Sequence, residues 1–60
     1  MNVKIARITK NLTQAQLAKM VGVSHVTISR IEKGKIEEIR FGTLKKIAAA
    51  LDSTVSELFF

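Results

Sequence analysis

Apolar residues recur along the chain at intervals of three and four, which is the spacing of one face of an α-helix. No stretch alternates between apolar and polar residues for long enough to form a strand, and the chain contains no proline. The pattern predicts five short helices, over residues 3–10, 14–21, 25–33, 44–51 and 55–59. We therefore expect an all-α protein in which residues 1–60 form a single compact domain.

Polar residues mark the expected start of each helix. A side-chain oxygen at this position can accept one of the backbone N–H groups that the first turn leaves without a partner. The expected N-caps are Asn2, Thr13, Ser24, Thr43 and Thr54. Gln16 and Glu57 each follow a cap by three residues, which is the spacing of a capping box. The first three helices should end at residues that tolerate a left-handed backbone, namely Asn11, Gly22 and Gly34.

The apolar stripe of each helix gives the expected core. Ile5 and Ile8 should point inward from the first helix. The second, third and fourth helices should contribute Leu17, Ala18, Val21, Ile28, Ile31, Leu44, Ile47, Ala48 and Leu51. Between the third and fourth helices we expect a loop over residues 35–42, with the ring of Phe41 anchored in the core.

Residues 14–33, QAQLAKMVGVSHVTISRIEK, contain the most informative pattern of the chain. Two short helices are separated by Gly22, Val23 and Ser24, and glycine adopts the left-handed conformation of such a turn without steric cost. The small side chain of Ala18 lets the two helices cross at close range. This arrangement is a helix-turn-helix, in which the second helix enters the major groove of DNA.

The stretch from Leu12 to Lys35 resembles the helix-turn-helix of the Cro and phage-repressor family of transcription regulators. The resemblance follows the family pattern almost position by position. It continues through Arg40 and Phe41 to the apolar positions of the last two helices, so that it covers residues 3–59. It implies a lambda-repressor-like domain of five helices that binds double-stranded DNA. The function it implies is transcription regulation, most often repression.

The outward face of the third helix is expected to read DNA bases. Ile28 and Ile31 are needed in the core, and the first part of such a helix enters the major groove. The expected base-reading residues are Ser24, His25, Val26, Thr27 and Arg30.

Each of these side chains has a chemistry that suits a base edge. The Arg30 guanidinium can donate two hydrogen bonds to guanine, and the methyl groups of Val26 and Thr27 can contact a thymine methyl. His25 can offer either a donor or an acceptor. Two structural alternatives stay open: His25 as an ordinary surface residue, and Val26 as additional packing on the preceding turn.

The family resemblance also implies contacts with the DNA backbone. Gln14 occupies the position of a glutamine that holds a phosphate and braces the first base-reading residue. The other implied phosphate-binding residues are Lys33, Lys35, Arg40 and Thr43. Glu37 and Glu38 depart from the pattern, because this loop is often basic in phage repressors and acidic side chains repel phosphate. Arg7 and Glu32 match a family pair that joins the first helix to the third, and we interpret them as structural.

The net charge of +5 favours a polyanionic partner because it is unevenly distributed. Seven of the ten basic residues lie within residues 1–35, beside a single acidic residue, Glu32. Lysines that only solvate an exposed surface would give the same count. Charge alone therefore leaves this alternative open, but charge together with the helix-turn-helix motif favours DNA as the partner.

Other classes of function find little support in the composition. The chain has no cysteine, one histidine, one aspartate and no glycine-rich phosphate loop. We therefore expect no enzymatic activity, no catalytic residues, no metal site and no cofactor. No small-molecule ligand is evident. No apolar run approaches the roughly 18 residues of a membrane span, and no signal-peptide pattern is visible, so we expect no membrane partner and a cytoplasmic location.

The last six residues carry a surplus of apolar side chains. Val55 and Leu58 are enough to dock the last helix, which would leave Phe59 or Phe60 exposed in a monomer. We therefore expect a homodimer on a palindromic operator, with an interface that contains Val55, Leu58, Phe59 and Phe60. The structural alternative is that Phe59 completes the monomer core. The functional alternative is an antitoxin-type interaction module that binds a protein through this end and binds DNA only secondarily.

Overall fold

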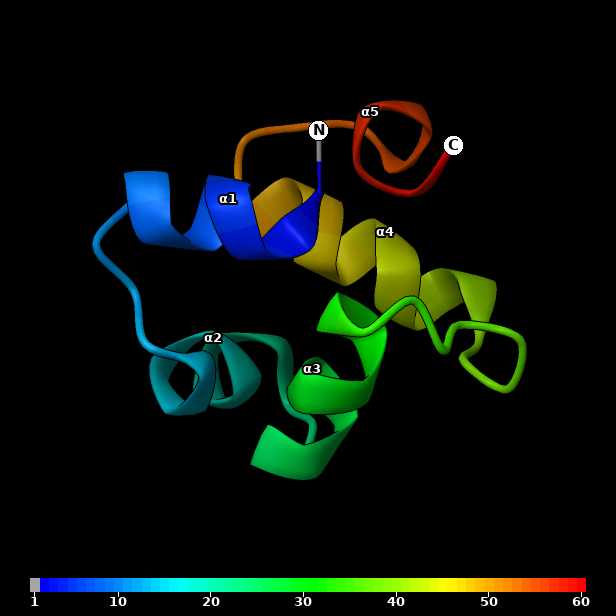
Figure 1. The fold of residues 1–60 in the computed structure, drawn as a ribbon, viewed down its shortest axis with the longest axis horizontal. Coiled ribbons are helices and arrows are strands. Elements are labelled where there is room, and N and C mark those ends of the chain that lie inside the picture. Colours follow the sequence, from blue (N-terminus) through cyan, green and yellow to red (C-terminus); the bar gives the residue numbers. More distant parts are fainter. Residues whose placement is uncertain (1) are drawn as a thin grey trace.

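The computed structural model describes residues 2–60. These residues form five helices and no strand: α1 (Val3–Thr9), α2 (Gln14–Val21), α3 (His25–Glu32), α4 (Phe41–Ala50) and α5 (Val55–Phe59) (Figure 1). The all-α prediction is confirmed, and every helix except α4 lies within one residue of its expected bounds. None of the helices in residues 2–60 is long and apolar enough to cross a membrane.

Side-chain caps begin four of the helices at the predicted positions. The caps of α1, α2, α3 and α5 are Asn2, Thr13, Ser24 and Thr54. Complete capping boxes start α2 and α5, because Gln16 and Glu57 each accept a hydrogen bond from the cap backbone in return. A cap of this kind stabilises a helix by about 1 kcal/mol, so the chain fixes these helix starts locally.

Left-handed residues end the first three helices, as predicted. Asn11 has φ 58°, and Gly22 and Gly34 both have φ 84°. At Gly22 no heavy atom lies within 4 Å of the position that a Cβ would occupy. The turn between α2 and α3 therefore favours glycine because of its positive φ, although there is space for a side chain at this position.

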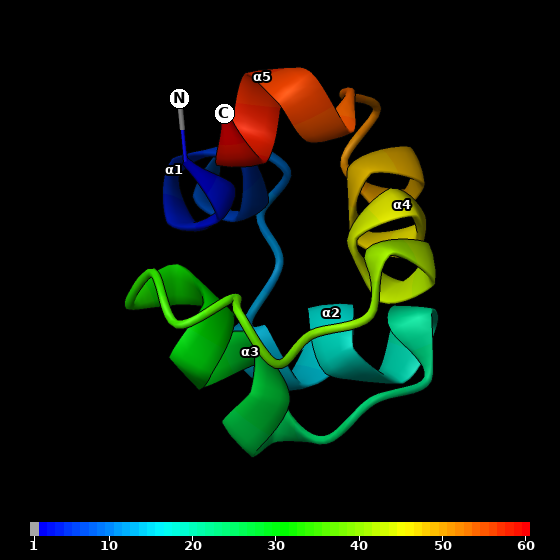
Figure 2. The ribbon, with the colours of Figure 1, turned by 90° about the vertical axis from the view of Figure 1, so that its right-hand side faces the viewer.

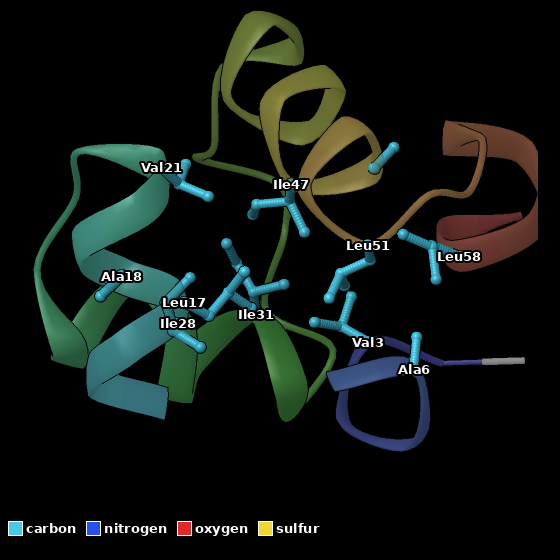
Figure 3. Close-up of a cluster of buried hydrophobic side chains, with 11 residues drawn as sticks. Val3, Ala6, Leu17, Ala18, Val21, Ile28, Ile31, Ile47, Leu51 and Leu58 are labelled. Atoms are coloured by element: carbon cyan, nitrogen blue, oxygen red, sulfur yellow. The ribbon is translucent and has the colours of Figure 1, made fainter. Parts of the chain in front are cut away.

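The core lies where α2, α3 and α4 meet, and Figure 2 shows all five helices arranged around it. Leu17, Ile28 and Ile47 come from these three helices and are fully buried (Figure 3). Each such side chain contributes about 1.5–3 kcal/mol of burial free energy. All the core residues predicted for α2, α3 and α4 are buried, so this part of the prediction is confirmed. Val3 and Ala6 of α1 and Leu58 of α5 complete the cluster.

The predicted inward face of α1 is wrong. Ile5 and Ile8 are 55% and 54% exposed, whereas Val3, Ala6 and Arg7 are the buried residues of this helix. Ile5 follows Val3 by two residues, which places the two side chains about 200° apart around the helix. Burial of the Arg7 stripe therefore turns both isoleucines toward solvent.

The predicted start of α4 is also wrong. The helix begins at Phe41, three residues before the expected position, and its N-cap is Arg40, which makes no side-chain capping hydrogen bond. Thr43 consequently lies inside the first turn and caps nothing. Phe41 is 59% exposed, so its ring does not anchor the preceding loop in the core.

Candidate nucleic-acid interface

The first turns of α3 form an exposed ridge at one end of the molecule, beside α2 (Figures 1 and 2). Ile28 and Ile31 are buried against the core, as the prediction requires. His25 and Val26 are exposed, and the Arg30 side chain is 55% exposed. Val26 is 64% exposed, so it does not pack on the preceding turn. These three predicted base-reading residues therefore have exposed side chains, and Ser24 is exposed as well.

The other two predicted base-reading residues, Ser24 and Thr27, are engaged with each other. The Ser24 hydroxyl accepts a hydrogen bond from the Thr27 backbone N–H at 3.1 Å, and the two hydroxyl oxygens lie 3.0 Å apart. Thr27 is half-buried. Ser24 therefore serves as the N-cap of α3, and its hydroxyl has less freedom than the sequence suggests to reach a base.

A buried ion pair attaches α3 to α1. The Arg7 Nε donates to Glu32 Oε2 at 2.6 Å, and Arg7 Nη2 donates to Glu32 Oε1 at 3.3 Å. The side chains of Arg7 and Glu32 are only 10% and 5% exposed. Arg7 Nη1 also donates to the Leu12 carbonyl at 2.6 Å, which ties the loop before α2 to the same group. The predicted structural pairing of Arg7 with Glu32 is confirmed.

The environment of Glu32 keeps its carboxylate charged. Burial alone would raise the pKa of Glu32, but hydrogen bonds from Arg7 and Gln14 and the positive charges of Arg7 and Lys4 outweigh this effect. The pKa of Glu32 consequently lies below its ordinary value of 4.5. At neutral pH the group is an anion that accepts hydrogen bonds and donates none.

Gln14 connects this ion pair to the exposed ridge. Its Nε2 donates to Glu32 Oε1 at 3.0 Å, and its Oε1 lies 2.7 Å from His25 Nε2. Gln14 thus contacts His25, the first residue of α3, as the family resemblance implies for a glutamine that braces the reading helix. The hydrogen bond from Gln14 to Glu32 could not be predicted, because the spacing of residues in the sequence does not show which side chains meet where α2 crosses α3.

The remaining residues predicted to contact phosphate lie at the end of α3 and from there to the first turn of α4. Lys33, Lys35 and Arg40 are exposed, whereas Thr43 is half-buried in the first turn of α4. The Lys35 backbone N–H donates to the Arg30 carbonyl at 3.0 Å, which holds this lysine beside the end of α3. Contact of these four residues and of Gln14 with phosphate stays a prediction.

Glu38, one of the two acidic residues that depart from the family pattern, lies next to Arg30. Glu38 Oε2 is 3.8 Å from Arg30 Nη2, and the two residues line a hollow together with Thr27, Lys35, Glu37 and Ile39. Both side chains are largely exposed, so the pair is weak. It nevertheless places a negative charge beside Arg30 at the edge of the candidate interface.

The predicted dimer residues divide between the core and the surface. Leu58 is buried, and Val55 and Phe59 are half-buried and packed against the core. Phe60 is 86% exposed. Of the four residues, Phe60 alone is exposed in the monomer, and the prediction that Val55 and Leu58 dock α5 agrees with the observed burial.

The fold and the exposed ridge define the class of this protein: a helix-turn-helix module built to present one helix to DNA. A family model described as Helix-turn-helix matches residues 3–58 of the chain. The chain belongs to the Cro and phage-repressor helix-turn-helix family, whose members are DNA-binding transcription regulators. Comparisons with curated proteins and with solved structures gave no match.

Proposed function

We propose that this protein is a sequence-specific repressor that binds a palindromic operator as a homodimer and places α3 in the major groove. The observation that carries the proposal is the attachment of the exposed ridge to a rigid support. His25 is held through Gln14 by Glu32, which is in turn held by Arg7. A reading helix fixed in this way loses little conformational entropy when it binds, which favours specific contacts.

The charges that follow α3 support the same proposal. Lys33, Lys35 and Arg40 carry exposed positive side chains at the end of α3 and in the segment between α3 and α4, as phosphate contacts require. The base-reading set would be His25, Val26 and Arg30, with Ser24 and Thr27 at the edge of the groove. Double-stranded DNA is the partner, so we place the protein in the cytoplasm, and the proposal requires no small-molecule ligand and no enzymatic step.

The homodimer rests on the exposed ring of Phe60 and on the surface next to it. A hollow lies between the start of α1, the end of α3 and α5, and the apolar part of its lining includes Val3, Ile31, Ile36 and Phe59. Burial of one phenylalanine on each partner contributes about 1.5–3 kcal/mol per ring. Sedimentation of the wild type and of Phe60→Ser tests this part. The proposal expects a dimer that Phe60→Ser dissociates, and a wild-type monomer at high concentration contradicts it.

Selection of bound duplexes from a randomised library tests the proposed function as a whole. The expected product is a palindrome whose half-sites are centred about one helical turn, or 34 Å, apart. Recovery of no preferred sequence would overturn the proposal. Repression itself is tested by placing the selected site in a promoter upstream of a reporter gene, where expression of the protein should lower the reporter signal.

The exposed face of α1 favours a second candidate, an antitoxin-type module that binds another protein. Ile5 and Ile8 are both more than half exposed and lie three residues apart, so they share one face of the helix. An apolar face of this kind suits a protein partner. This candidate expects Ile5→Ser and Ile8→Ser to leave DNA selection unchanged while abolishing neutralisation of a co-expressed toxin.

A further inference from the structure

The hydrogen bonds that support α3 end at the His25 ring, which is the first side chain of the exposed ridge. The chain of contacts runs from Arg7 through Glu32 and Gln14 to His25 Nε2, with donor–acceptor distances of 2.6, 3.0 and 2.7 Å. Every member of this chain has restricted donor and acceptor roles. The roles can therefore be assigned one after another, starting from the buried end.

The buried end determines how the Gln14 amide is oriented. Glu32 is a carboxylate and only accepts hydrogen bonds, so the Gln14 group that contacts it must be the NH₂ group. The carbonyl oxygen of Gln14 then faces His25. An amide oxygen only accepts, so His25 Nε2 must carry the hydrogen in this contact.

The second nitrogen of the ring is then determined as well. In a neutral imidazole one nitrogen donates and the other accepts, and the hydrogen bond of one nitrogen fixes the role of the other. No residue within 2–60 forms a hydrogen bond with His25 Nδ1. In the neutral ring with Nε2 protonated, Nδ1 is an acceptor without a partner in residues 2–60, on an exposed side chain at the start of α3.

We propose that the chain from Arg7 to Gln14 holds His25 as the Nε2-protonated tautomer, so that Nδ1 selects a base with an exocyclic amine, adenine or cytosine. The inference rests on the proposed function, because it states what one residue of the reading helix recognises. Adenine and cytosine present N6–H and N4–H donors in the major groove, whereas guanine and thymine present only acceptors and a methyl group. Gln14 and Glu32 are positioning residues for this choice.

The expected preference follows from one hydrogen bond. If the base offers an acceptor in place of the amine, the Nδ1 lone pair faces another lone pair and the hydrogen bond is lost. The loss of one hydrogen bond should lower the affinity about two- to tenfold. His25→Ala identifies the base position, because only there should the preference disappear. His25 is exposed and lies outside the core, so this variant should fold.

Gln14→Lys provides a reversal test. A lysine ammonium donates three hydrogen bonds and accepts none. At position 14 it can keep the contact with Glu32 while it donates to His25 Nε2, which forces the proton onto Nδ1. The base position read by His25 should then change its preference to guanine or thymine. Met20→Lys is the control, because it adds the same charge to an exposed part of α2 outside the chain of contacts.

Two measurements are made on each protein. Long-range ¹H–¹⁵N correlation of the imidazole identifies the protonated nitrogen in the free protein, and selection from a randomised duplex library gives the base preference. The wild type and Met20→Lys should show an Nε2-protonated ring with adenine or cytosine at the His25 position. Gln14→Lys should show an Nδ1-protonated ring with guanine or thymine there.

A wild-type ring protonated at Nδ1, or a wild-type selection with no preference between the amine-bearing base and its partner on a given strand at this position, would overturn the inference alone. So would a Gln14→Lys protein that keeps the wild-type tautomer, or one that reverses the tautomer without changing the base preference. Selection of no sequence by the wild type would overturn the proposed function, and the base preference with it. The two failures are therefore distinguishable.

Discussion

Replacement of Arg7 by methionine keeps most of the side-chain stem and removes the guanidinium. The variant leaves the Glu32 carboxylate, whose side chain is 5% exposed, without its ionic partner, and it removes the donor 2.6 Å from the Leu12 carbonyl. Loss of one partner from a buried ion pair costs about 3–5 kcal/mol, and the lost backbone contact adds about 1 kcal/mol. The free energy of unfolding of a native protein is about 0.05–0.15 kcal/mol per residue, which gives about 3–9 kcal/mol for a chain of this length. Arg7→Met should therefore lose most of its stability in urea unfolding followed by circular dichroism.

The pH dependence of the same variant has the opposite sign to that of the wild type. In the wild type the pKa of Glu32 is lower in the folded state than in the unfolded state. The ionised carboxylate therefore stabilises the fold fully above pH 4.5, and this stabilisation is lost as the pH falls through the folded-state pKa. In Arg7→Met, burial without a partner raises the pKa of Glu32. The ionised group then destabilises the fold at neutral pH, and stability should recover as the pH falls toward 4.5.

The double variant Arg7→Met, Glu32→Leu is the control, because it removes both charges and leaves an apolar contact. Apart from about 1 kcal/mol for the lost contact with the Leu12 carbonyl, it should be close to the wild type in stability, or more stable. A loss of less than about 1 kcal/mol in Arg7→Met, or a double variant as unstable as the single one, would refute the view that an uncompensated buried carboxylate causes the damage.

Further predictions concern the turn and the acidic loop. Gly22→Val should destabilise the fold by about 1–3 kcal/mol, because a β-branched residue resists positive φ. Gly42→Ala, in α4 where nothing lies within 4 Å of the added Cβ, should stabilise it slightly; equal melting temperatures for the two variants would contradict this account. Glu38→Gln should strengthen DNA binding about two- to fivefold at low salt, because it frees Arg30 from a weak competing pair. Unchanged or weaker binding in a titration would show that Glu38 does not compete with DNA.

The helix starts and the turn could be predicted because single residues determine them. Thr13 with Gln16 and Thr54 with Glu57 form boxes whose partners lie three residues apart, and Gly22 meets a backbone requirement at one position. Such features depend on the local chain, which the sequence displays directly. The buried faces of α2, α3 and α4 could also be predicted, because the spacing of their apolar residues defines one face on each helix.

The orientation of α1 could not be predicted from its own residues. A helix of seven residues has two possible apolar faces here, and the larger side chains favoured the one with Ile5 and Ile8. The observed face carries Val3, Ala6 and Arg7, and Arg7 reaches Glu32 on another helix. Which of the two faces is buried thus depends on contacts with other helices, which the residues of α1 alone do not reveal.

Two further features also depend on tertiary packing. The start of α4 has no side-chain cap at Arg40, so no local signal places Phe41 in the helix. The contact of Gln14 with Glu32 joins residues 18 positions apart across the crossing of α2 and α3. The sequence could indicate that Gln14 braces His25, through the family resemblance, but the roles of the individual atoms required the structure.

The most direct test of the central claim, that α3 reads base sequence, compares Arg30→Ala with Lys35→Ala on the selected operator and its single-base variants over a range of salt. Arg30→Ala should cost about 1–3 kcal/mol and remove the preference at one base position of each half-site. Lys35→Ala should weaken binding to all variants equally and reduce the salt slope by about one. If Arg30→Ala left every relative preference unchanged, the assignment of α3 as the reading helix would be contradicted.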